Sequence, residues 1–297
     1  MEHNKFERYL DVLKLLSCRV VGQRQAKMAI AEGLSPHKIQ KIPAPIIAAI
    51  GRYGHGKLTV LRMLTQYLYG NDIAIYNGIG IDRLSDRYFT EVSHDSLFYR
   101  PLYGENTLRT LELLNAETKK LRELGEFRRG FFIQVNLSSD LYRFDDHDPT
   151  EVLINAAMSE PPKQMTPEIV RAVIEMADVV LPFECLSEQE LHELVRVSLN
   201  NKLFRHQAYA ASKFGNPSPA SVQFSDEVVS WLLSEIVEKE GSYPSGNAIQ
   251  QGVEEIFSDN DLYDQIMNAR ADLLVDLKGG TIVVTKIGKR GVAPFWL

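Results

Sequence analysis

The sequence predicts an α/β protein in which a parallel sheet covered by helices is followed by a smaller helical domain. Three observations support this fold class. Short apolar runs alternate with helical segments over the first part of the chain, an order typical of parallel sheets with helices on both faces. A glycine-rich loop joins the first of these runs to a helix, and capped helices then dominate the second part. We therefore expect a large α/β domain over 1–183 and a small helical domain with a short terminal sheet over 184–297.

Two N-terminal helices are predicted within 5–34, because apolar positions follow a helical period on both sides of a break at "CRVVGQ". The run "IPAPIIAAI" (42–50) predicts a buried strand, since it is rich in isoleucine and bounded by Pro and Gly. The helix after the glycine loop is expected to stop at Gly70. The other predicted elements of the large domain are strands at 72–78, 96–99 and 130–137 and a helix over 107–124.

The second part carries explicit helix-start signals. Ser187, followed three residues later by Glu190, forms a capping box. Ser225 is a cap for a second helix with acidic residues in its first turn, and Gly241 stops that helix. A small-residue and proline loop, "ASKFGNPSPASVQ", separates these two helices, and "NAIQQGVEEIF" predicts a third. The run "GGTIVVTKIG" predicts a terminal strand.

The bulk composition excludes several classes of protein. A net charge of −6 argues against a general nucleic-acid binder, because phosphate neutralisation needs clustered Lys and Arg. No apolar run approaches the roughly 20 residues that a membrane span requires, and the polar start "MEHNKFERYL" lacks the apolar core of a signal peptide. The two cysteines, Cys18 and Cys185, are expected to be small buried residues in a reducing compartment. These features predict a cytoplasmic protein with no membrane partner.

The stretch "GRYGHGKL" has the spacing of a phosphate-binding loop. Gly51, Gly54 and Gly56 allow backbone N–H groups to approach an anion, and the helix that follows adds partial positive charge. Lys57 would reach the β and γ phosphates. The next position normally supplies the hydroxyl that binds Mg²⁺, and here it is Leu58. Two interpretations stay open: a nucleotide loop that lacks its metal ligand, or a glycine turn that binds nothing.

Five segments occur in an order that suggests one protein family. They are "RVVGQRQAKMAI", "GRYGHGKL", "FRRGFFIQVNLSSDL", "MADVVLPFECLSEQEL" and "GSYPSGNAIQQGVEEI". In this order they resemble the entry motif, Walker A loop, sensor-1 strand, domain junction and sensor-2 stretch of AAA+ modules of Clp-type unfoldases, closest to the second ATPase module of ClpB-like disaggregases. The resemblance extends from about residue 5 to residue 285. It implies an AAA+ P-loop domain followed by a helical lid domain.

The resemblance also implies where a nucleotide would bind. The Val-Gly-Gln of the entry motif lines the adenine pocket in the family, and the sensor-1 strand supplies a polar side chain. His55, inside the glycine loop, is a candidate hydrogen-bond donor to an anion. These groups recognise phosphate and adenine without a metal, so ATP or ADP is the expected ligand, whereas Leu58 argues against Mg²⁺. The expected nucleotide-binding residues are Val21, Gly22, Gln23, Gly51, Gly54, His55, Gly56, Lys57 and Asn136.

The departures from the family fall on its catalytic positions. Pro101 and Leu102 stand where the Walker B acids are expected, and Glu105 is out of register with them. Met176 replaces the arginine finger and Tyr243 the sensor-2 arginine. The chain after "DIAIYNG" is also too short for the family's substrate-gripping pore loop. Phosphoryl transfer depends on positioning and charge neutralisation, and an arginine finger alone is worth about 10³–10⁵ in rate. The sequence therefore predicts that hydrolysis is lost, with no catalytic residues and no metal site.

The resulting interpretation is an AAA+ pseudo-ATPase that acts as a scaffold or assembly subunit, by self-association or by docking on a related active ATPase or larger assembly. One alternative is a working ATPase that receives its missing groups from a partner, with Glu105 or Asp95 moved into place. A carboxylate within reach of Lys57 would favour that alternative. Another is an adaptor in which nucleotide changes the angle between the domains without being consumed.

The segment "FDDHD" (144–148) concentrates carboxylates and a histidine, which are residue types that bind metals. The acids lie side by side in a predicted loop. Asp148 followed by Pro149 is typical of a helix cap and a first helical residue. We therefore interpret this segment as structural.

Overall fold

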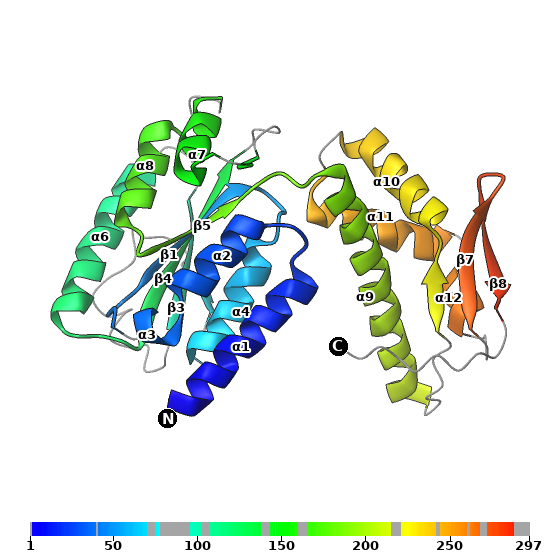
Figure 1. Ribbon diagram of the computed structural model, residues 1–297, viewed down its shortest axis with the longest axis horizontal. Helices are drawn as coiled ribbons and strands as arrows, with labels where there is room; N and C mark the ends of the chain where they lie inside the picture. Colours follow the sequence, from blue (N-terminus) through cyan, green and yellow to red (C-terminus); the bar gives the residue numbers. More distant parts are fainter. Residues whose placement is uncertain are drawn as a thin grey trace. The chain divides into compact units, whose positions relative to one another are not determined.

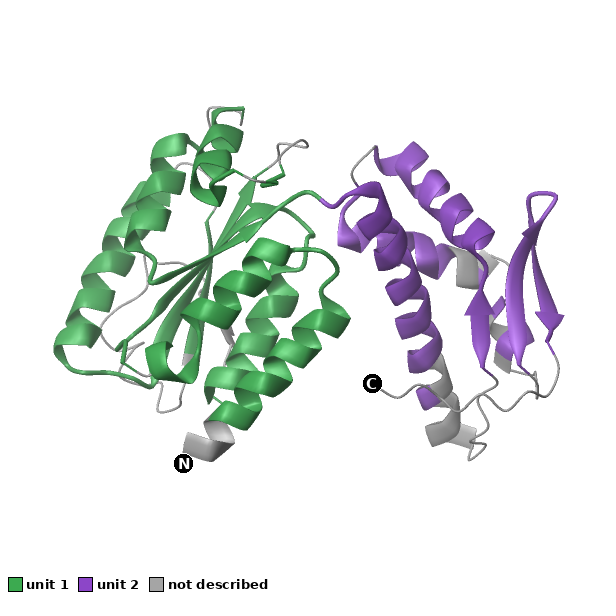
Figure 2. Cartoon of the chain, viewed as in Figure 1, with its two compact units in different colours: residues 1–185 green, residues 186–297 purple. Residues whose placement is uncertain are grey.

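The computed structural model (Figure 1) describes residues 2–39, 41–69, 75–77, 96–102, 107–137, 143–145, 147–159, 165–214, 221–241, 244–259, 262–267 and 272–287. The chain forms two compact units, residues 1–185 and 186–297 (Figure 2). Each unit has its own sheet and its own hydrophobic core. Among the described residues, no helix combines the length and the apolar character that a bilayer span requires.

The first unit is built on a five-stranded sheet with the strand order β2-β3-β4-β1-β5. All neighbouring strands in it are parallel, so the predicted α/β class is confirmed. Because carboxyl ends of parallel strands share one edge, the residues that follow β1, β3, β4 and β5 meet there. The strands are β1 (Ile46–Arg52), β2 (Ile75–Asn77), β3 (Ser96–Leu102), β4 (Arg129–Leu137) and β5 (Val179–Phe183).

Helices cover both faces of this sheet (Figure 1). The helices α1, α2 and α4 lie on one face, and α6, α7 and α8 lie on the other. The short helix α3 packs against α1. Their bounds are α1 (Glu2–Arg19), α2 (Arg24–Gly33), α3 (Pro36–Ile39), α4 (Lys57–Tyr69), α6 (Thr107–Glu123), α7 (Pro149–Met158) and α8 (Pro167–Met176).

The central position of β1 explains its continuous apolar sequence. The residues from Ile46 to Ile50 are at most 1% exposed, because β4 and β5 flank the strand and helices cover both of its faces. The strand predicted at 42–50 begins only at Ile46 and continues to Arg52. The prolines that precede Ile46 cannot complete a ladder of backbone hydrogen bonds, so the strand starts after them.

The helices α7 and α8 begin in the same way, with a side-chain cap followed by proline. The Asp148 carboxylate accepts a hydrogen bond from the Thr150 backbone N–H at 2.8 Å, and the Thr166 hydroxyl accepts one from the Ile169 backbone N–H at 3.4 Å. Each cap satisfies a backbone donor that the first helical turn leaves unbonded. The interpretation of Asp148 as a helix cap is confirmed.

The second unit consists of helices packed against a three-stranded sheet with the order β6-β7-β8. The capping box is confirmed, since the Glu190 carboxylate accepts hydrogen bonds from the Ser187 N–H at 2.7 Å and hydroxyl at 2.8 Å. Ser225 caps α10 through the Val228 N–H at 3.3 Å. The elements are α9 (Glu188–Phe214), β6 (Val222–Phe224), α10 (Asp226–Glu240), α11 (Gly246–Asp259), α12 (Leu262–Met267), β7 (Leu273–Lys278) and β8 (Thr281–Lys286).

Two local expectations need correction, whereas the predicted terminal strand is confirmed. The helix α9 continues to Phe214, so the first four residues of the loop expected at "ASKFGNPSPASVQ" are helical. Cys18 is exposed, although both cysteines were expected to be buried; only Cys185 is. The terminal strand is one arm of a hairpin, β7–β8, whose turn contains Gly279 and Gly280 with φ values of 58° and 79°. Two consecutive positive φ angles are the requirement of a tight hairpin turn, which glycine meets without strain.

Candidate nucleotide-binding site

The glycine-rich loop connects the buried strand β1 to the helix α4 at the carboxyl edge of the sheet. Gly54 and Gly56 have φ values of 79° and 93°, whereas His55 between them is not among the residues with positive φ. This alternation in the sign of φ is typical of a nest, in which successive backbone N–H groups converge on an anion. The first hydrogen bond of α4 runs from the Val60 N–H to the Gly56 carbonyl at 3.0 Å. The N–H groups before Val60 are therefore left for a phosphate.

Gly51 is required where the loop leaves β1. Its φ is 151°, and a Cβ placed on it would lie 2.2 Å from the Phe183 carbonyl oxygen and 2.6 Å from the Phe183 Cβ. The backbones of β1 and β5 thus approach each other at a point where only a hydrogen atom fits. The loop is held against the end of β5 by this contact.

Lys57, the first residue of α4, turns its ammonium group back to the start of the loop. Its Nζ donates hydrogen bonds to the Gly51 carbonyl at 2.7 Å and to the Arg52 carbonyl, and it lies 5.8 Å from the centroid of the Phe183 ring. The side chain is 3% exposed. Burial away from water lowers the pKa of Lys57 to about 7, and the nearby Cys185 thiol opposes this shift. Among the ion pairs of the described residues, none involves Lys57.

The Val-Gly-Gln segment lies beside the loop. A Cβ on Gly56 would come within 3.7 Å of the Val20 side chain, and Val21 is 8% exposed. Gly22 and Gln23 both adopt positive φ, 59° and 54°. This turn lies against the glycine loop, and the adenine pocket that the resemblance implies here stays a prediction.

The Gln23 side chain, however, is used by the protein itself. Its Nε2 donates to the Glu184 carbonyl at 2.9 Å, and its Oε1 accepts from the Glu184 N–H at 3.0 Å. Gln23 is 1% exposed. Both polar groups of the amide are thereby bonded to the backbone of Glu184, the residue that directly follows β5. Gln23 positions the segment, and the adenine-facing groups would be the backbone and Val21.

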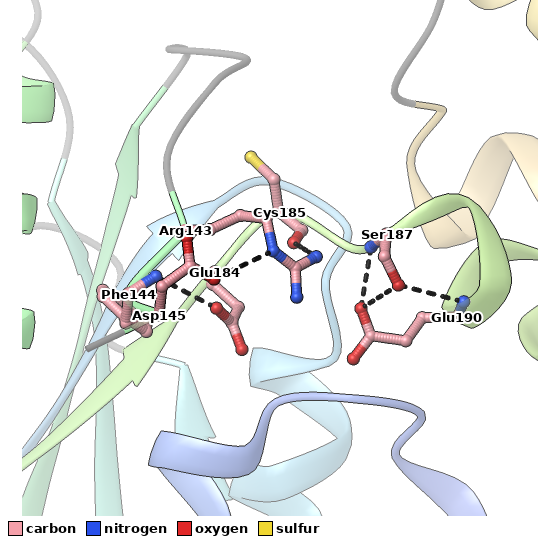
Figure 3. Close-up of polar contacts among 7 residues, drawn as sticks. All are labelled: Arg143, Phe144, Asp145, Glu184, Cys185, Ser187 and Glu190. Atoms are coloured by element: carbon pink, nitrogen blue, oxygen red, sulfur yellow. Dashed lines mark hydrogen bonds and ion pairs between the residues drawn. The ribbon is translucent and has the colours of Figure 1, made fainter. Parts of the chain in front are cut away.

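The chain after β4 is also tied to the end of β5 (Figure 3). The Glu184 carboxylate, on a residue that is 6% exposed, accepts a hydrogen bond from the Phe144 N–H at 3.2 Å. The Arg143 guanidinium donates to the Cys185 carbonyl at 3.2 Å and lies 3.8 Å from the Asp145 carboxylate. Residues 183–185 are therefore the point where the glycine loop, the Val-Gly-Gln turn and the segment after β4 meet.

Asn136 lies on β4 directly beside Gly51 in the sheet register. Its Oδ1 accepts a hydrogen bond from the Gln134 Nε2 at 2.9 Å, and the Gln134 Oε1 accepts one from the Tyr99 hydroxyl at 2.9 Å. The row of three polar side chains runs from β3 to the edge of the loop. Because its oxygen is engaged, the group that Asn136 can offer to a phosphate is its Nδ2 donor.

His55 is buried in the loop, at 5% exposure. Its Nδ1 lies 3.0 Å from the Tyr53 carbonyl, and since a carbonyl only accepts, this nitrogen carries the proton. Burial lowers the pKa of His55 to about 4, with the charges of Lys57 and Arg52 acting in the same direction and the Tyr53 hydrogen bond opposing them. At neutral pH and without a bound anion the ring is therefore uncharged, with its proton on Nδ1, so Nε2 would donate to an anion only if the charge of that anion raised the pKa of His55.

The burial of His55 predicts a specific loss of stability in acid. A histidine whose folded pKa lies below its unfolded value, near 6.5, binds its proton more readily when unfolded. The contribution of the neutral His55 ring to the free energy of unfolding is fully present above pH 6.5 and is lost as the pH falls toward 4. We expect the free energy of unfolding to fall by about 2 kcal/mol between pH 7 and pH 5 through this residue alone.

Urea unfolding of the wild type and His55→Asn at both pH values measures this difference. The variant should lose less stability on acidification than the wild type by that amount. His37→Asn, at an exposed position on α3, is the matched control. Equal pH dependence of all three proteins would contradict the assignment.

Among the described residues, the positions that the resemblance assigns to hydrolysis carry no metal-binding or charged side chain. Leu58 is 45% exposed and has no hydroxyl, so the residues here do not fit the usual Mg²⁺ ligand set. Pro101 and Leu102 are the last residues of β3, the strand that pairs with β4. Met176 ends α8. Asp95, Glu105 and Tyr243 lie outside the described residues, and within the described part no His, Cys, Asp and Glu side chains gather as a metal site.

No family model matches the chain, and no curated protein sequence matches it. Among solved structures, a cryo-EM reconstruction of Hsp104 in its closed state, with ATPγS and FITC casein, matches with a TM-score of 0.52 and 12% sequence identity. Hsp104 is a ClpB-like AAA+ unfoldase. The fold is that of an AAA+ module. The match covers 92% of this chain and 49% of the Hsp104 chain, so the protein spans about half the length of that structure. At this identity the likeness establishes the AAA+ fold and leaves the activity to the site.

The structure thus brings the sequence-predicted residues of the AAA+ fold to one edge of the sheet, and it adds others that the sequence did not indicate. Phe183 and Glu184 lie within the domain-junction segment "MADVVLPFECLSEQEL", which the sequence did not mark as part of the site. Their roles depend on contacts with residues more than a hundred positions away, for which local pattern holds no signal. The polar pair of Tyr99 and Gln134 could have been noticed as two polar residues inside otherwise apolar strands.

Proposed function

We propose that the protein is a cytoplasmic AAA+ pseudo-ATPase, which binds ATP or ADP without hydrolysing it and serves as a scaffold or assembly subunit. The observation that carries the proposal is the glycine loop. Positive φ angles at Gly54 and Gly56, the unbonded N–H groups at the start of α4 and the buried Lys57 together form a phosphate nest. A bound triphosphate would place a negative charge beside the Lys57 ammonium, which has no carboxylate partner among the ion pairs of the described residues.

The proposed loss of hydrolysis is supported by the side chains at the positions where the family carries its catalytic groups. Leu58 cannot hold Mg²⁺, and the end of β3 offers Pro101 and Leu102 in place of acids. The helix that would carry an arginine finger ends in Met176; Arg171 is a turn and more before it. An arginine finger is worth about 10³–10⁵ in rate, and a bound metal ion supplies several kcal/mol of transition-state charge stabilisation. The side chains at these described positions can provide neither an arginine nor a metal ligand, which supports binding without turnover.

A scaffold role is proposed by analogy with the AAA+ fold, whose modules commonly assemble through their flat faces. The Hsp104 reconstruction contains ATPγS and FITC casein, and nucleotide-dependent contact with other proteins is extended to this chain as part of the proposal. Either self-association or docking on an active AAA+ ATPase would use such faces. A carboxylate paired with Lys57 would have favoured a working ATPase, and the ion pairs of the described residues include none.

Calorimetric titration with ATP and with ADP, each with and without Mg²⁺, tests the proposal. We expect binding that is independent of Mg²⁺, with no phosphate release from the same sample. Because the pKa of Lys57 is lowered to about 7, its amine is mostly neutral at pH 8, and a phosphate beside it would restore the proton. Binding at pH 8 should therefore take up about one proton, seen as a difference between the heats in Tris and in HEPES.

Lys57→Met should remove both the binding and the proton uptake, whereas Lys38→Met, on an exposed residue of α3, should change neither. Sedimentation of the same samples would report the expected assembly. Mg²⁺-dependent phosphate release would show that the catalytic acids lie elsewhere in the chain and would exclude a pseudo-ATPase. Absence of any nucleotide binding would reduce the glycine loop to a structural turn.

A further inference from the structure

A groove runs between α10 and α11 in the second unit, and none of the residues that line it belongs to the candidate nucleotide site. Its volume is about 220 Å³, which is below the roughly 300–1,000 Å³ of pockets that hold small-molecule ligands. A space of this size suits a single long side chain better than a cofactor or substrate. The residues that line it differ sharply between its floor and its rim.

The floor of the groove is apolar. Leu232 and Ile236 of α10 lie opposite Ala248 and Gly252 of α11. The two helices are close there, since a Cβ on Gly252 would lie 2.6 Å from the Ile236 Cγ1. Leu232 and Ile236 are 1% and 3% exposed, so they support the floor from the core, and the partly buried Ala248 and Gly252 supply its accessible part. Such a floor accepts the methylene stem of a long side chain.

The rim of the groove is acidic. Glu235, Glu240 and Glu255 provide three carboxylates, and Lys239 provides one ammonium. The Lys239 Nζ lies 3.1 Å from the Glu255 Oε2, and the Gln251 amide donates to the Glu255 Oε1 at 3.4 Å. With three negative groups against one positive group, the rim favours a cation.

An aromatic ring completes the groove. Trp231 lines the same space one turn before Glu235 and is only partly buried. The face of an indole attracts a cation within about 6 Å. An apolar floor, an acidic rim and an indole together match a side chain that has a methylene stem and a flat charged head. Arginine fits this description better than lysine, because its planar guanidinium both stacks on aromatic faces and forms paired hydrogen bonds to carboxylates.

We propose that the α10–α11 groove is a docking site for an arginine side chain carried by a partner polypeptide. The stem of the arginine lies on Ala248 and Gly252, and the guanidinium binds the carboxylates of Glu235 and Glu240 beside Trp231. This surface does not depend on nucleotide, so it goes beyond the function proposed above. It gives a scaffold protein a local, charge-selective contact on its second unit.

The test uses the full-length protein and an acetylated, amidated hexa-arginine peptide as the probe, with the same peptide built from citrulline as the uncharged control. Glu235→Gln/Glu240→Gln should weaken hexa-arginine binding at least about tenfold. Glu227→Gln/Glu238→Gln, which removes the same charge from exposed positions of α10 outside the groove, should keep binding within about twofold. In a Trp296→Phe background, which leaves Trp231 as the single tryptophan, the arginine peptide should change the emission.

Other outcomes would overturn the proposal. Equal weakening by both pairs of substitutions would mean a general attraction to an acidic protein. Equal binding of the citrulline peptide, or no binding of hexa-arginine by the wild type, would exclude arginine recognition. If sedimentation shows self-association that Glu235→Gln/Glu240→Gln abolishes, the groove is occupied by a second copy of this chain and the partner assignment is wrong.

Discussion

Gly51→Ala is expected to lower the free energy of unfolding by about 2–5 kcal/mol, the combined cost of overpacking and of a strained backbone. The added methyl group would lie 2.2 Å from the Phe183 carbonyl oxygen. That atom belongs to the backbone of β5, which is paired with β1 in the centre of the sheet, so it cannot move aside as a flexible side chain would. The strands must separate, and the glycine loop moves with them.

Gly125→Ala provides the matched control for this substitution. Gly125 also has a positive φ, 66°, but a Cβ placed on it meets no atom within 4 Å. Its replacement should cost only the left-handed backbone penalty, about 1–2 kcal/mol. Chemical denaturation of the three proteins, followed by circular dichroism, measures both values. If Gly51→Ala is no more destabilised than Gly125→Ala, the close approach of β1 and β5 is not present in solution.

Gln23→Ala is the second substitution with a large expected effect. It removes the acceptor of the Glu184 N–H and the donor to the Glu184 carbonyl, and both groups lie in the buried interior. Leaving a buried polar group unsatisfied costs about 1–3 kcal/mol. We therefore expect a loss of about 2–5 kcal/mol, together with weaker nucleotide binding because the Val-Gly-Gln turn is released from the loop.

Denaturation and ATP titration of the same variant separate the two effects. Gln250→Ala, at an exposed position of α11, should stay within about 0.5 kcal/mol of the wild type. A Gln23→Ala protein of wild-type stability would show that water replaces the amide at Glu184. Full stability with lost ATP binding would instead identify Gln23 as a ligand-contacting residue.

Local sequence was sufficient for elements whose causes are local. The capping box of Ser187 and Glu190, the cap at Asp148 and the stop at Gly241 depend on residues within one turn of each other, so their patterns can be read directly. The strand–loop–helix of "GRYGHGKL" is local in the same sense. The spacing of its glycines predicted a phosphate-binding type of loop between a strand and a helix, and in the structure Gly54 and Gly56 of that loop adopt positive φ angles.

The departures from the resembled family are also visible in the sequence, but their proposed meaning depends on where the residues lie in the fold. Leu58 directly follows Lys57, so the missing hydroxyl needs no structure to be recognised. Pro101 and Leu102 matter only because β3 pairs with β4 and brings its end toward the edge that carries Asn136. Strand order is a property of the whole sheet, which a single segment does not encode.

The sequence by itself determined the α/β class, the strand–glycine loop–helix order and the principal helix starts, because each follows from short-range pattern. Only the tertiary structure decided that both polar groups of the Gln23 side-chain amide form hydrogen bonds with the Glu184 backbone, and that His55 is buried and neutral. It also decided that the α10–α11 groove combines an apolar floor with acidic residues and Trp231. The physical reason is common to all three. Burial, hydrogen-bond partners and pKa depend on which distant residues exclude water from a group, and that is settled only when the chain has packed.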